Sequence, residues 1–240
     1  DKGNEKAFTR KFRTLGKALP VAQTVCLTPE MVKNGFVVPA SGTADGYIRY
    51  TAKPGTVLNS NGIDAIKVSN VNYIIIDGLT ICGAKENGIR IENASNIVVR
   101  NCDISKFGRV GVQRTTHGGV YYYCEVIKGK KTKERILNSD AGIYIENAKN
   151  LLIEKNFIHD NFDANTSTTA TTYAIYSLGD GTATAPVIIR NNIIKSIKGF
   201  PVYAIYISTA LNNLVYNNTI DLDRLNPAGS GVFAGIYLTG

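Results

Sequence analysis

The sequence predicts an all-β fold, a right-handed parallel β-helix in which short strands stack coil upon coil. A Gly-Ile-x-Ile strand, a polar turn and a second apolar strand occur together at 87–104 and 141–158, return at 173–194 and 203–220, and begin again at 234–238. Within each copy apolar residues alternate with polar ones, as in strands that bury one face. Because such short strands cannot bury that face alone, the copies must stack to form a core.

The composition fits this fold class. The chain has 240 residues, 23 glycines and no tryptophan, and charged residues make up only 19% of it. These values favour short strands and tight turns over surface helices, within one well-buried domain.

The length of a coil follows from one apolar position in each copy. Successive anchor residues are separated by 23, 22, 32, 36 and 26 residues, so a minimal coil has about 22 residues and longer steps carry loops. Three strands and three turns per coil favour a parallel β-helix over a leucine-rich repeat, whose Leu-x-x-Leu-x-Leu signature is missing. The anchors are Ile81, Ile104, Val126, Ile158, Ile194 and Ile220.

We expect the β-helix to span residues 36–240, after an N-terminal arm or cap over 1–35 that is basic and then apolar. The last copy opens at Gly231 and stops, so we expect the helix to be incomplete at its C-terminal end. An uncapped end would expose a sheet edge, which predicts self-association through it.

Aligning the copies places a column of small or polar residues in the turn before each anchor. Its three asparagines predict a ladder of side-chain hydrogen bonds. Its two adjacent cysteines predict either a disulfide between coils or, as the favoured interpretation, two small buried thiols. The column reads Leu79, Cys102, Cys124, Asn156, Asn192 and Asn218.

A second, outward column carries charges of alternating sign. Opposite charges on neighbouring strands predict cross-strand pairs on a solvated face. This column reads Asp77, Arg100, Tyr122, Glu154, Arg190 and Tyr216.

The Gly-Ile-x-Ile strands carry a third column, which turns from basic to aromatic. Its tyrosines either stabilise the sheet by stacking on one another or form a platform for sugar rings or a partner surface. The column reads Lys67, Arg90, Gly111, Tyr144, Tyr176, Tyr206 and Tyr237.

Two acidic residues, Glu92 and Glu146, follow on the same strands. They form solvated pairs with Arg90, or hold Ca²⁺ or act as acid or base if a loop supplies further ligands. A loop over 128–135 has five basic residues in eight, among them Lys130 and Lys131, and we expect it to overhang this face.

The net charge of +8 indicates an anionic partner. Nucleic acid is a weak candidate because charge alone supports it. No apolar run reaches the length of a membrane span, so we expect no membrane insertion. The two histidines, His117 and His159, have no second ligand at metal spacing.

These repeats, together with the stretch Ser41–Gly55, resemble the pectin-lyase-like right-handed parallel β-helix superfamily. The resemblance covers roughly residues 36–240 and implies a secreted protein with a groove on the Gly-Ile-x-Ile strands. It implies Lys67 or Arg90 as base or charge neutraliser, and Glu92 and Glu146 as Ca²⁺ ligands. Such enzymes remove the proton next to a uronate carboxylate and eliminate the glycosidic oxygen. This chain departs from them because its column is mostly tyrosine where the enzymes cluster aspartates.

Two functions therefore stay open. The first is a secreted protein that binds an anionic, uronate-containing polysaccharide through Lys130, Lys131 and the four tyrosines, with cleavage by β-elimination left undecided. The alternative is a non-catalytic structural or adhesive module, such as a segment of a surface fibre, filament or phage spike. The tyrosine ladder, the uncapped end and the scarcity of acidic groove residues favour the alternative, but the first function is the one we predict.

Overall fold

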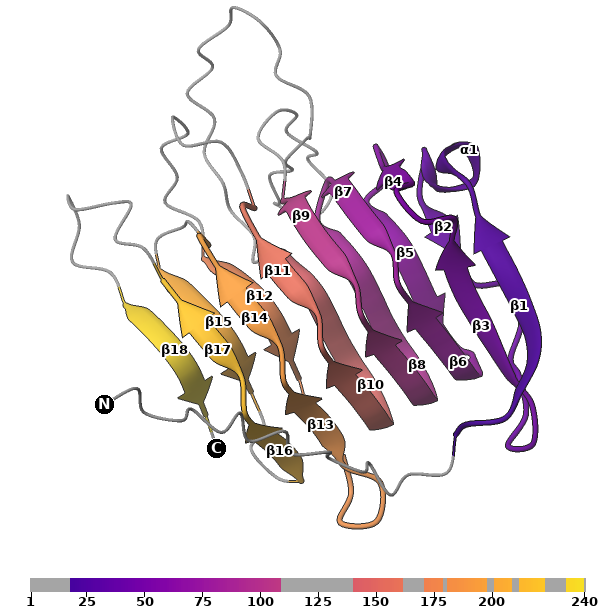
Figure 1. Cartoon of the computed structure of the whole chain (residues 1–240). Coiled ribbons are helices and arrows are strands. Elements are labelled where there is room, and N and C mark those ends of the chain that lie inside the picture. Colours follow the sequence, from indigo (N-terminus) through magenta and orange to yellow (C-terminus); the bar gives the residue numbers. More distant parts are fainter. Residues whose placement is uncertain are drawn as a thin grey trace, which may run out of the picture.

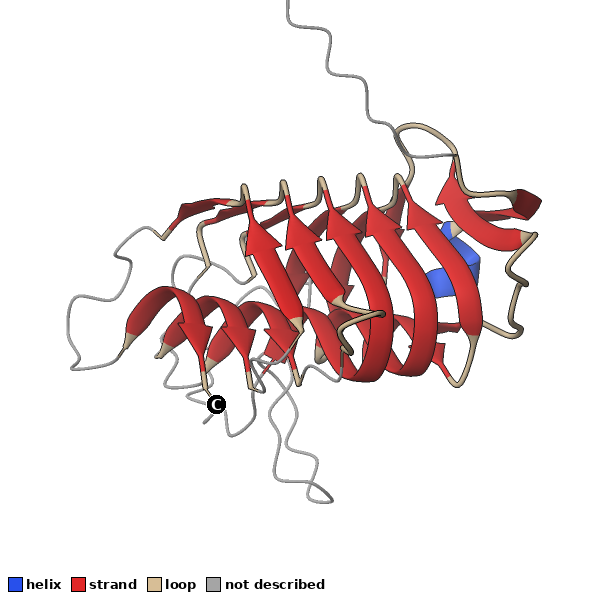
Figure 2. Ribbon diagram, turned by 90° about the horizontal axis from the view of Figure 1, so that it is seen from below, coloured by secondary structure: helices blue, strands red, loops and turns tan. Residues whose placement is uncertain are grey.

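The computed structural model describes most of the repeat region, with gaps. The described residues are 18–108, 140–161, 171–178, 181–197, 201–208, 212–222 and 232–239. Their strands stack in parallel into a β-helix with three faces, as the sequence predicts (Figure 1). Figure 2 shows the strands in successive rows along one axis, with the single short helix of the described residues at one end.

The first face consists of the Gly-Ile-x-Ile strands and their equivalents. All neighbouring pairs on it are parallel. Its strands are β2 (Phe36–Val37), β5 (Asp64–Ser69), the first half of β8 (Asn87–Arg100), the first half of β10 (Asp140–Glu154), β12 (Thr172–Ser177), β15 (Val202–Ile207) and β18 (Phe233–Leu238).

The second and third faces complete each coil. The second face contains β1 (Val21–Leu27), β3 (Tyr47–Ala52), β6 (Asn72–Asp77), the second halves of β8 and β10, β13 (Val187–Arg190) and β16 (Asn213–Tyr216). The third contains β4 (Val57–Asn59), β7 (Thr80–Ala84), β9 (Asp103–Phe107), β11 (Phe157–His159), β14 (Ile193–Lys195) and β17 (Thr219–Asp221).

The polar turn inside the repeat is the bend between the first two faces. β8 and β10 run through it without a break, and the backbone turns at left-handed residues, Asn93 and Asn96 in β8 and Asn147 and Asn150 in β10. Asparagine tolerates this conformation better than other residues with a side chain, apart from aspartate. The recurring asparagines of the repeat therefore set where each coil bends.

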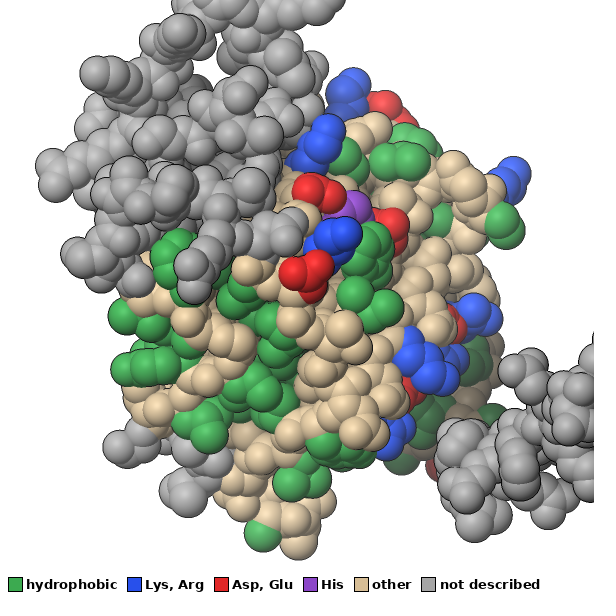
Figure 3. Space-filling model, turned by 60° about the vertical axis from the view of Figure 1, so that its left-hand side comes forward, with side chains coloured by type: hydrophobic (Ala, Val, Ile, Leu, Met, Phe, Trp, Pro, Cys, Tyr) green, Lys and Arg blue, Asp and Glu red, His purple; other side chains and the backbone are tan. Residues whose placement is uncertain are grey.

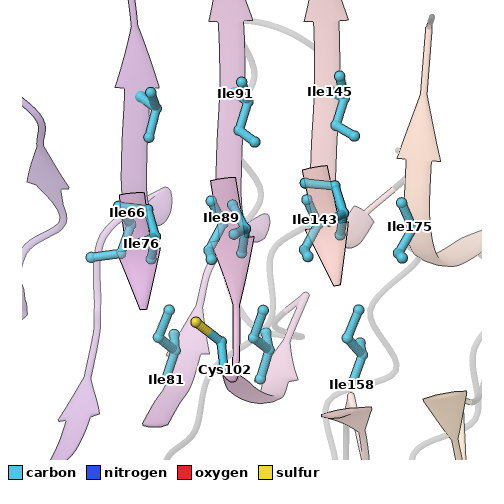
Figure 4. Packing of buried hydrophobic residues seen from close by; sticks show 14 of the residues in the cluster. Ile66, Ile76, Ile81, Ile89, Ile91, Cys102, Ile143, Ile145, Ile158 and Ile175 are labelled. Carbon is cyan, nitrogen blue, oxygen red and sulfur yellow. The ribbon is translucent and has the colours of Figure 1, made fainter. Parts of the chain in front are cut away.

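The core is a stack of isoleucine columns. Ile66, Ile89, Ile143, Ile175 and Ile205 lie in register on the first face, and each is fully buried. Figure 4 shows the first four of these side chains beside Ile81 and Ile158 from the third face. Apart from the position assigned to Val126, the predicted anchor residues pair in the predicted order, Ile81 with Ile104, then Ile158, Ile194 and Ile220.

The predicted asparagine ladder is confirmed between the second and third faces. Asn156 donates through Nδ2 to Oδ1 of Asn192 over 3.0 Å, and Asn192 donates in the same way to Asn218 over 2.9 Å. Each Nδ2 also donates to a backbone carbonyl one coil away, that of Val99 for Asn156 and Ile153 for Asn192. Buried polar groups need such partners, so the ladder satisfies the turn.

One predicted coil is wrong. Ile104 pairs directly with Ile158, so no coil lies between β9 and β11, where the sequence spacing had placed Val126. Gly111, Tyr122, Cys124, Lys130 and Lys131 lie outside the described residues.

The loss of this coil also changes the predicted column of turn residues, in which Cys124 had stood between Cys102 and Asn156. The backbone N–H of Cys102 donates directly to Oδ1 of Asn156, 3.1 Å away, in the next coil. Cys102 is a free, buried thiol, so the disulfide proposed for it is not formed, and its burial agrees with the favoured interpretation. Cys82, which the sequence did not single out, is the disulfide-bonded cysteine of the described residues.

The charge column pairs as predicted, but its acids are not solvated. Asp77 contacts Arg100 at 3.0 Å and Arg49 at 3.1 Å, and Glu154 contacts Arg190 at 2.9 Å. Asp77 is only 5% exposed and Glu154 7%, because flanking side chains cover both carboxylates.

The two ends of the described stack differ. At one end, α1 (Pro29–Val32), capped by Thr28, buries Val32 in the core beside β4. At the β18 end, Phe233, Ile236 and Leu238 are 41%, 49% and 57% exposed. Figure 3 shows hydrophobic side chains gathered on this surface. No helix among the described residues is long and apolar enough to cross a membrane.

Candidate ligand-binding face

The outward column on the first face is continuous from basic to aromatic residues. Lys67 on β5 lies opposite Arg90 on β8, and Arg90 lies directly opposite Tyr144 on β10. Tyr176, Tyr206 and Tyr237 follow on β12, β15 and β18. Lys67, Arg90, Tyr144 and Tyr206 each stand between two buried aliphatic residues, and the register places Tyr176 and Tyr237 in the same outward column. The structure therefore brings together every described residue that the sequence assigned to this column.

The tyrosine rings contact one another along the stack. The ring centroids of Tyr144 and Tyr176 are 5.4 Å apart, those of Tyr176 and Tyr206 5.1 Å, and those of Tyr206 and Tyr237 5.4 Å. The first two pairs meet edge to face and the third is stacked, geometries that stabilise aromatic pairs. The structure thus confirms that the ladder stacks on itself.

Two further tyrosines widen the ladder, and the sequence reasoning missed them. Tyr173 stacks on Tyr176 at 4.5 Å and on Tyr203 at 5.5 Å, while Tyr203 meets Tyr206 at 5.2 Å. The signal was the repeated Tyr-Ala-Ile-Tyr at 173–176 and 203–206. Partial burial raises the pKa of the Tyr176 and Tyr203 phenols, so they remain hydrogen-bond donors at neutral pH.

At the basic end of the column, Glu92 forms ion pairs with both Lys67 and Arg90. Its Oε1 lies 2.7 Å from Lys67 Nζ and accepts from the Ser69 hydroxyl at 2.8 Å, and its Oε2 accepts from Arg90 Nε at 2.7 Å. Burial alone would raise the pKa of Glu92. The hydrogen bonds from Lys67, Ser69 and Arg90 outweigh burial and lower that pKa to about 2.

Arg90 links the charged and aromatic parts of the face. Its Nη2 lies 3.6 Å from Oε2 of Glu146, and its guanidinium carbon lies 4.9 Å from the centroid of the Tyr144 ring. The Tyr144 hydroxyl donates to Glu146 Oε2 at 3.1 Å. Burial alone would lower the pKa of Arg90. The hydrogen bond to Glu92 and the nearby carboxylates raise that pKa by more than burial lowers it, so the guanidinium stays charged.

A partly buried acid beside this group also escaped the sequence reasoning. Asp64 begins β5 and accepts from Asn87 Nδ2 at 2.7 Å. Burial raises the pKa of Asp64, and the bond from Asn87 with the charges of Arg90 and Lys67 only partly offsets it. The sequence does hold a signal for this pair. Asp64 and Asn87 occupy equivalent places in neighbouring copies of the repeat, two residues before Ile66 and Ile89.

The predicted calcium ligands do not fit Ca²⁺ as they are arranged. Both oxygens of Glu92 already bind cationic or hydroxyl donors, and Arg90 lies between Glu92 and Glu146. Among the residues that the structure describes, no group of three or more His, Cys, Asp or Glu could hold a metal ion. The calcium site stays a prediction.

A separate charged group lies on the third face. His159 bridges two aspartates, with Nε2 2.9 Å from Asp103 and Nδ1 2.7 Å from Asp160, and its ring stacks on Phe157 at 4.0 Å. Figure 3 shows this histidine with acidic groups on either side. His159 lies on β11 of the third face, whereas the tyrosine ladder lies on the first face, so the histidine forms no part of the candidate face.

The three-faced parallel solenoid and its asparagine ladder define the class of protein, and sequence comparison gives the same answer. The profile of the right-handed β-helix region family matches residues 33–240, and the chain belongs to this family. The right-handed parallel β-helix that the sequence predicts is thereby confirmed.

Comparison with solved structures finds a crystal structure of an alginate lyase from Paenibacillus sp. strain FPU-7. It shares 14% sequence identity with this chain over 90% of this chain and 98% of that one, with a TM-score of 0.31. No curated protein matches this chain.

Proposed function

We propose that the first face binds an acidic polysaccharide that lies along the solenoid axis, across the strands. The observation that carries the proposal is the column of Tyr144, Tyr176, Tyr206 and Tyr237, in register on consecutive coils and continued by Arg90. We further propose that the protein is secreted, since the polymer is extracellular.

The ladder suits an extended polymer with hydroxyl groups. Its rings repeat at 5.1–5.4 Å, and their partly exposed faces and edges offer apolar contact to sugar C–H groups. The phenol hydroxyls add donors and acceptors beside each ring. A repeating ligand would therefore meet the same contact in every coil.

The charges favour an acidic polymer over a neutral one, but modestly. Lys67 and Arg90 are already paired with Glu92, so a ligand carboxylate must compete with that glutamate. The net charge of +8 adds long-range attraction, which salt screens. We therefore expect binding that weakens as the salt concentration rises.

The same geometry favours binding over β-elimination. Arg90 keeps its proton because its pKa is raised, so it would neutralise a carboxylate rather than act as a base. Lys67 is ion-paired with Glu92 at 2.7 Å, and an ammonium group has no lone pair with which to take a proton. A lyase activity would require Lys67 to leave that glutamate.

Titration of the protein with polygalacturonate, alginate and hyaluronate, beside neutral dextran, tests the proposal. We expect saturable, salt-sensitive binding to at least one acidic polymer and weaker binding to dextran. Ultraviolet absorbance of unsaturated products would report cleavage in the same samples. Absence of binding to every acidic polymer at low salt would overturn the proposal.

A structural or adhesive role is the second candidate, favoured by the self-stacking of the tyrosines. Tyr173 is only 7% exposed and stacks on Tyr176 and Tyr203, so part of the ladder stabilises the sheet. If replacing Tyr206 lowered stability while leaving polymer binding unchanged, the structural role would be supported instead.

A further inference from the structure

A second polar site lies at the bend between the first and second faces. An open groove of about 350 Å³ runs across neighbouring coils there. It follows the candidate face directly along the chain, since Tyr144 and Glu146 precede its β10 residues on the same strand. The residues that carry the argument are Asn72, Asn93, Ala94, Asn147, Ala148 and Lys149.

The groove has an apolar floor and a polar rim. Ala94 and Ala148 pair across β8 and β10 and are 4% and 1% exposed, so their small side chains leave the floor shallow. Asn93 and Asn147 stand beside them and are exposed. Sugar rings present C–H groups on their faces and hydroxyls at their edges, which such a floor and rim accommodate.

The rim retains unused hydrogen-bonding capacity. Asn147 donates Nδ2 to Oδ1 of Asn93, and the Ser95 N–H and hydroxyl both donate to Oδ1 of Asn72. Within the described part of the chain, this leaves Nδ2 of Asn72 and Asn93 and Oδ1 of Asn147 without a protein partner. The groove therefore offers donors on Asn72 and Asn93 and an acceptor on Asn147, and sugar hydroxyls can pair with both kinds of group.

A cation completes the lining. Lys149 pairs in register with Ser95 and is exposed, and none of the ion pairs among the described residues includes it. Lys67 and Arg90 are by contrast held by Glu92. A ligand carboxylate would meet less competition at Lys149 than at the basic end of the tyrosine column.

We infer that this groove binds a uronate unit of a polysaccharide, with the carboxylate on Lys149 and the hydroxyls on the amides of Asn93 and Asn147. The inference rests on the proposed function, because the same acidic polymer supplies the ligand. It adds a subsite away from the tyrosine ladder and assigns the charge preference to Lys149.

Backbone shape accounts for part of the sequence here, and the test must separate the two roles. Asn147 has a φ of 45° and Asn150 a φ of 53°, conformations that glycine also adopts. Asn147→Gly therefore removes the amide while keeping the bend. Asn150→Gly is the matched control, because Asn150 bonds Asn96 in the same ladder fashion but does not line the groove.

The experiment is a titration with trigalacturonate, with neutral galactotriose as comparison, read by two signals. Side-chain amide resonances of Asn93 and Asn147, assigned by their change in Asn147→Gly, report the groove. Tyrosine fluorescence, which is observable because the chain has no tryptophan, reports the ladder.

We expect both amide resonances to shift saturably with trigalacturonate. Asn147→Gly and Lys149→Gln should each weaken this binding roughly threefold to tenfold, while Asn150→Gly should bind like the parent. Amide shifts without a fluorescence change would support the groove and count against the ladder.

Two outcomes would overturn the inference. If fluorescence reports binding but the amide resonances stay fixed and the groove variants bind normally, the groove is wrong and the ladder stands. If neither signal responds to trigalacturonate or to the acidic polymers, the groove and the proposed function both fail.

Discussion

Arg90 and Tyr144 are distant in sequence, yet they lie opposite each other on β8 and β10, with the guanidinium carbon 4.9 Å from the ring centroid. This contact joins the charged end of the first face to its tyrosine ladder. It also brings Arg90 within 3.6 Å of Glu146, which accepts the Tyr144 hydroxyl. The charged and aromatic halves of the face are therefore one connected network. A substitution at Glu92 should alter the position of Arg90 and, through it, the contacts of Tyr144.

Replacing Glu92 with Gln should reduce the amount of folding stability that the protein loses as the pH falls. The pKa of Glu92 is about 2 in the folded protein, against 4.5 for the free side chain. Its contribution is therefore fully present above pH 4.5 and is lost as the pH falls toward 2. Urea unfolding at pH 7, 4.5 and 2.5 should show the parent losing more stability than Glu92→Gln, which we expect to be weaker at pH 7 by about 1–3 kcal/mol.

Glu30→Gln is the control for that series. Glu30 is 84% exposed in its side chain and makes one surface pair with Lys33, so its removal should change stability little at any of these pH values. Parallel acid profiles for the parent and Glu92→Gln would show that the ion pairs of Glu92 do not stabilise the fold.

Replacing Tyr206 with Ala should weaken polysaccharide binding about tenfold. Tyr206 contacts Tyr173, Tyr176, Tyr203 and Tyr237, so its loss interrupts the ladder at its centre. Tyr206→Phe keeps the ring and should retain more of the affinity, because ring contact supplies most of it. Affinity electrophoresis in an acidic polymer gel would measure both.

Tyr216→Ala is the matched control for the ladder. Tyr216 is an exposed tyrosine of the second face, bonded to Arg190 at 3.0 Å, and lies off the proposed path of the polymer. It should bind like the parent. Equal losses in Tyr206→Ala and Tyr216→Ala would indicate a general loss of folding rather than a ligand contact.

The sequence predicted the fold because its repeat records both the strand period and the bends. Ile89 and Ile143 share a column that alternation alone identifies, and Asn156, Asn192 and Asn218 mark their turn by spacing. The misplaced Val126 coil shows the limit of spacing. A segment between repeats can match the period by chance, whereas the pairing of Ile104 with Ile158 is decided by packing and backbone hydrogen bonds.

The candidate face was predicted in its outline but not in its partnerships. Alternation places Lys67, Arg90 and the tyrosines outward, and the structure agrees. The alternation pattern cannot predict that Glu92 pairs with both Lys67 and Arg90, because this pairing depends on rotamers and on distances across strands. The groove at Lys149 was missed for a related reason, because a cavity at a bend has no periodic signature.

Replacing Asn192 with Ala should destabilise the protein by at least about 3 kcal/mol. Asn192 is 1% exposed, donates to Ile153 O and Asn218, and accepts from the N–H and amide of Asn156. Each buried group left without a partner costs about 1–3 kcal/mol. Asn191→Gly, at an exposed residue with a φ of 55°, should change stability by only a few tenths of a kcal/mol. Urea unfolding of the two variants, side by side, would decide whether the ladder stabilises the stack.

Replacing Gly142 with Ala should destabilise the stack where the first face packs on the third. A Cβ at Gly142 would lie 2.7 Å from Cγ2 of Ile158 and 2.8 Å from the carbonyl oxygen of Ala174, so β10 or its neighbours must shift. Such overpacking costs typically about 1–3 kcal/mol. Gly235 stands at the equivalent position on β18, but its nearest neighbour would be Ile220 Cδ1 at 3.8 Å. Gly235→Ala should therefore stay within about 0.5 kcal/mol of the parent. Thermal and urea unfolding of both variants would test this, and a cost as large at Gly235 as at Gly142 would mean that glycine serves the strand backbone here rather than the contact between coils.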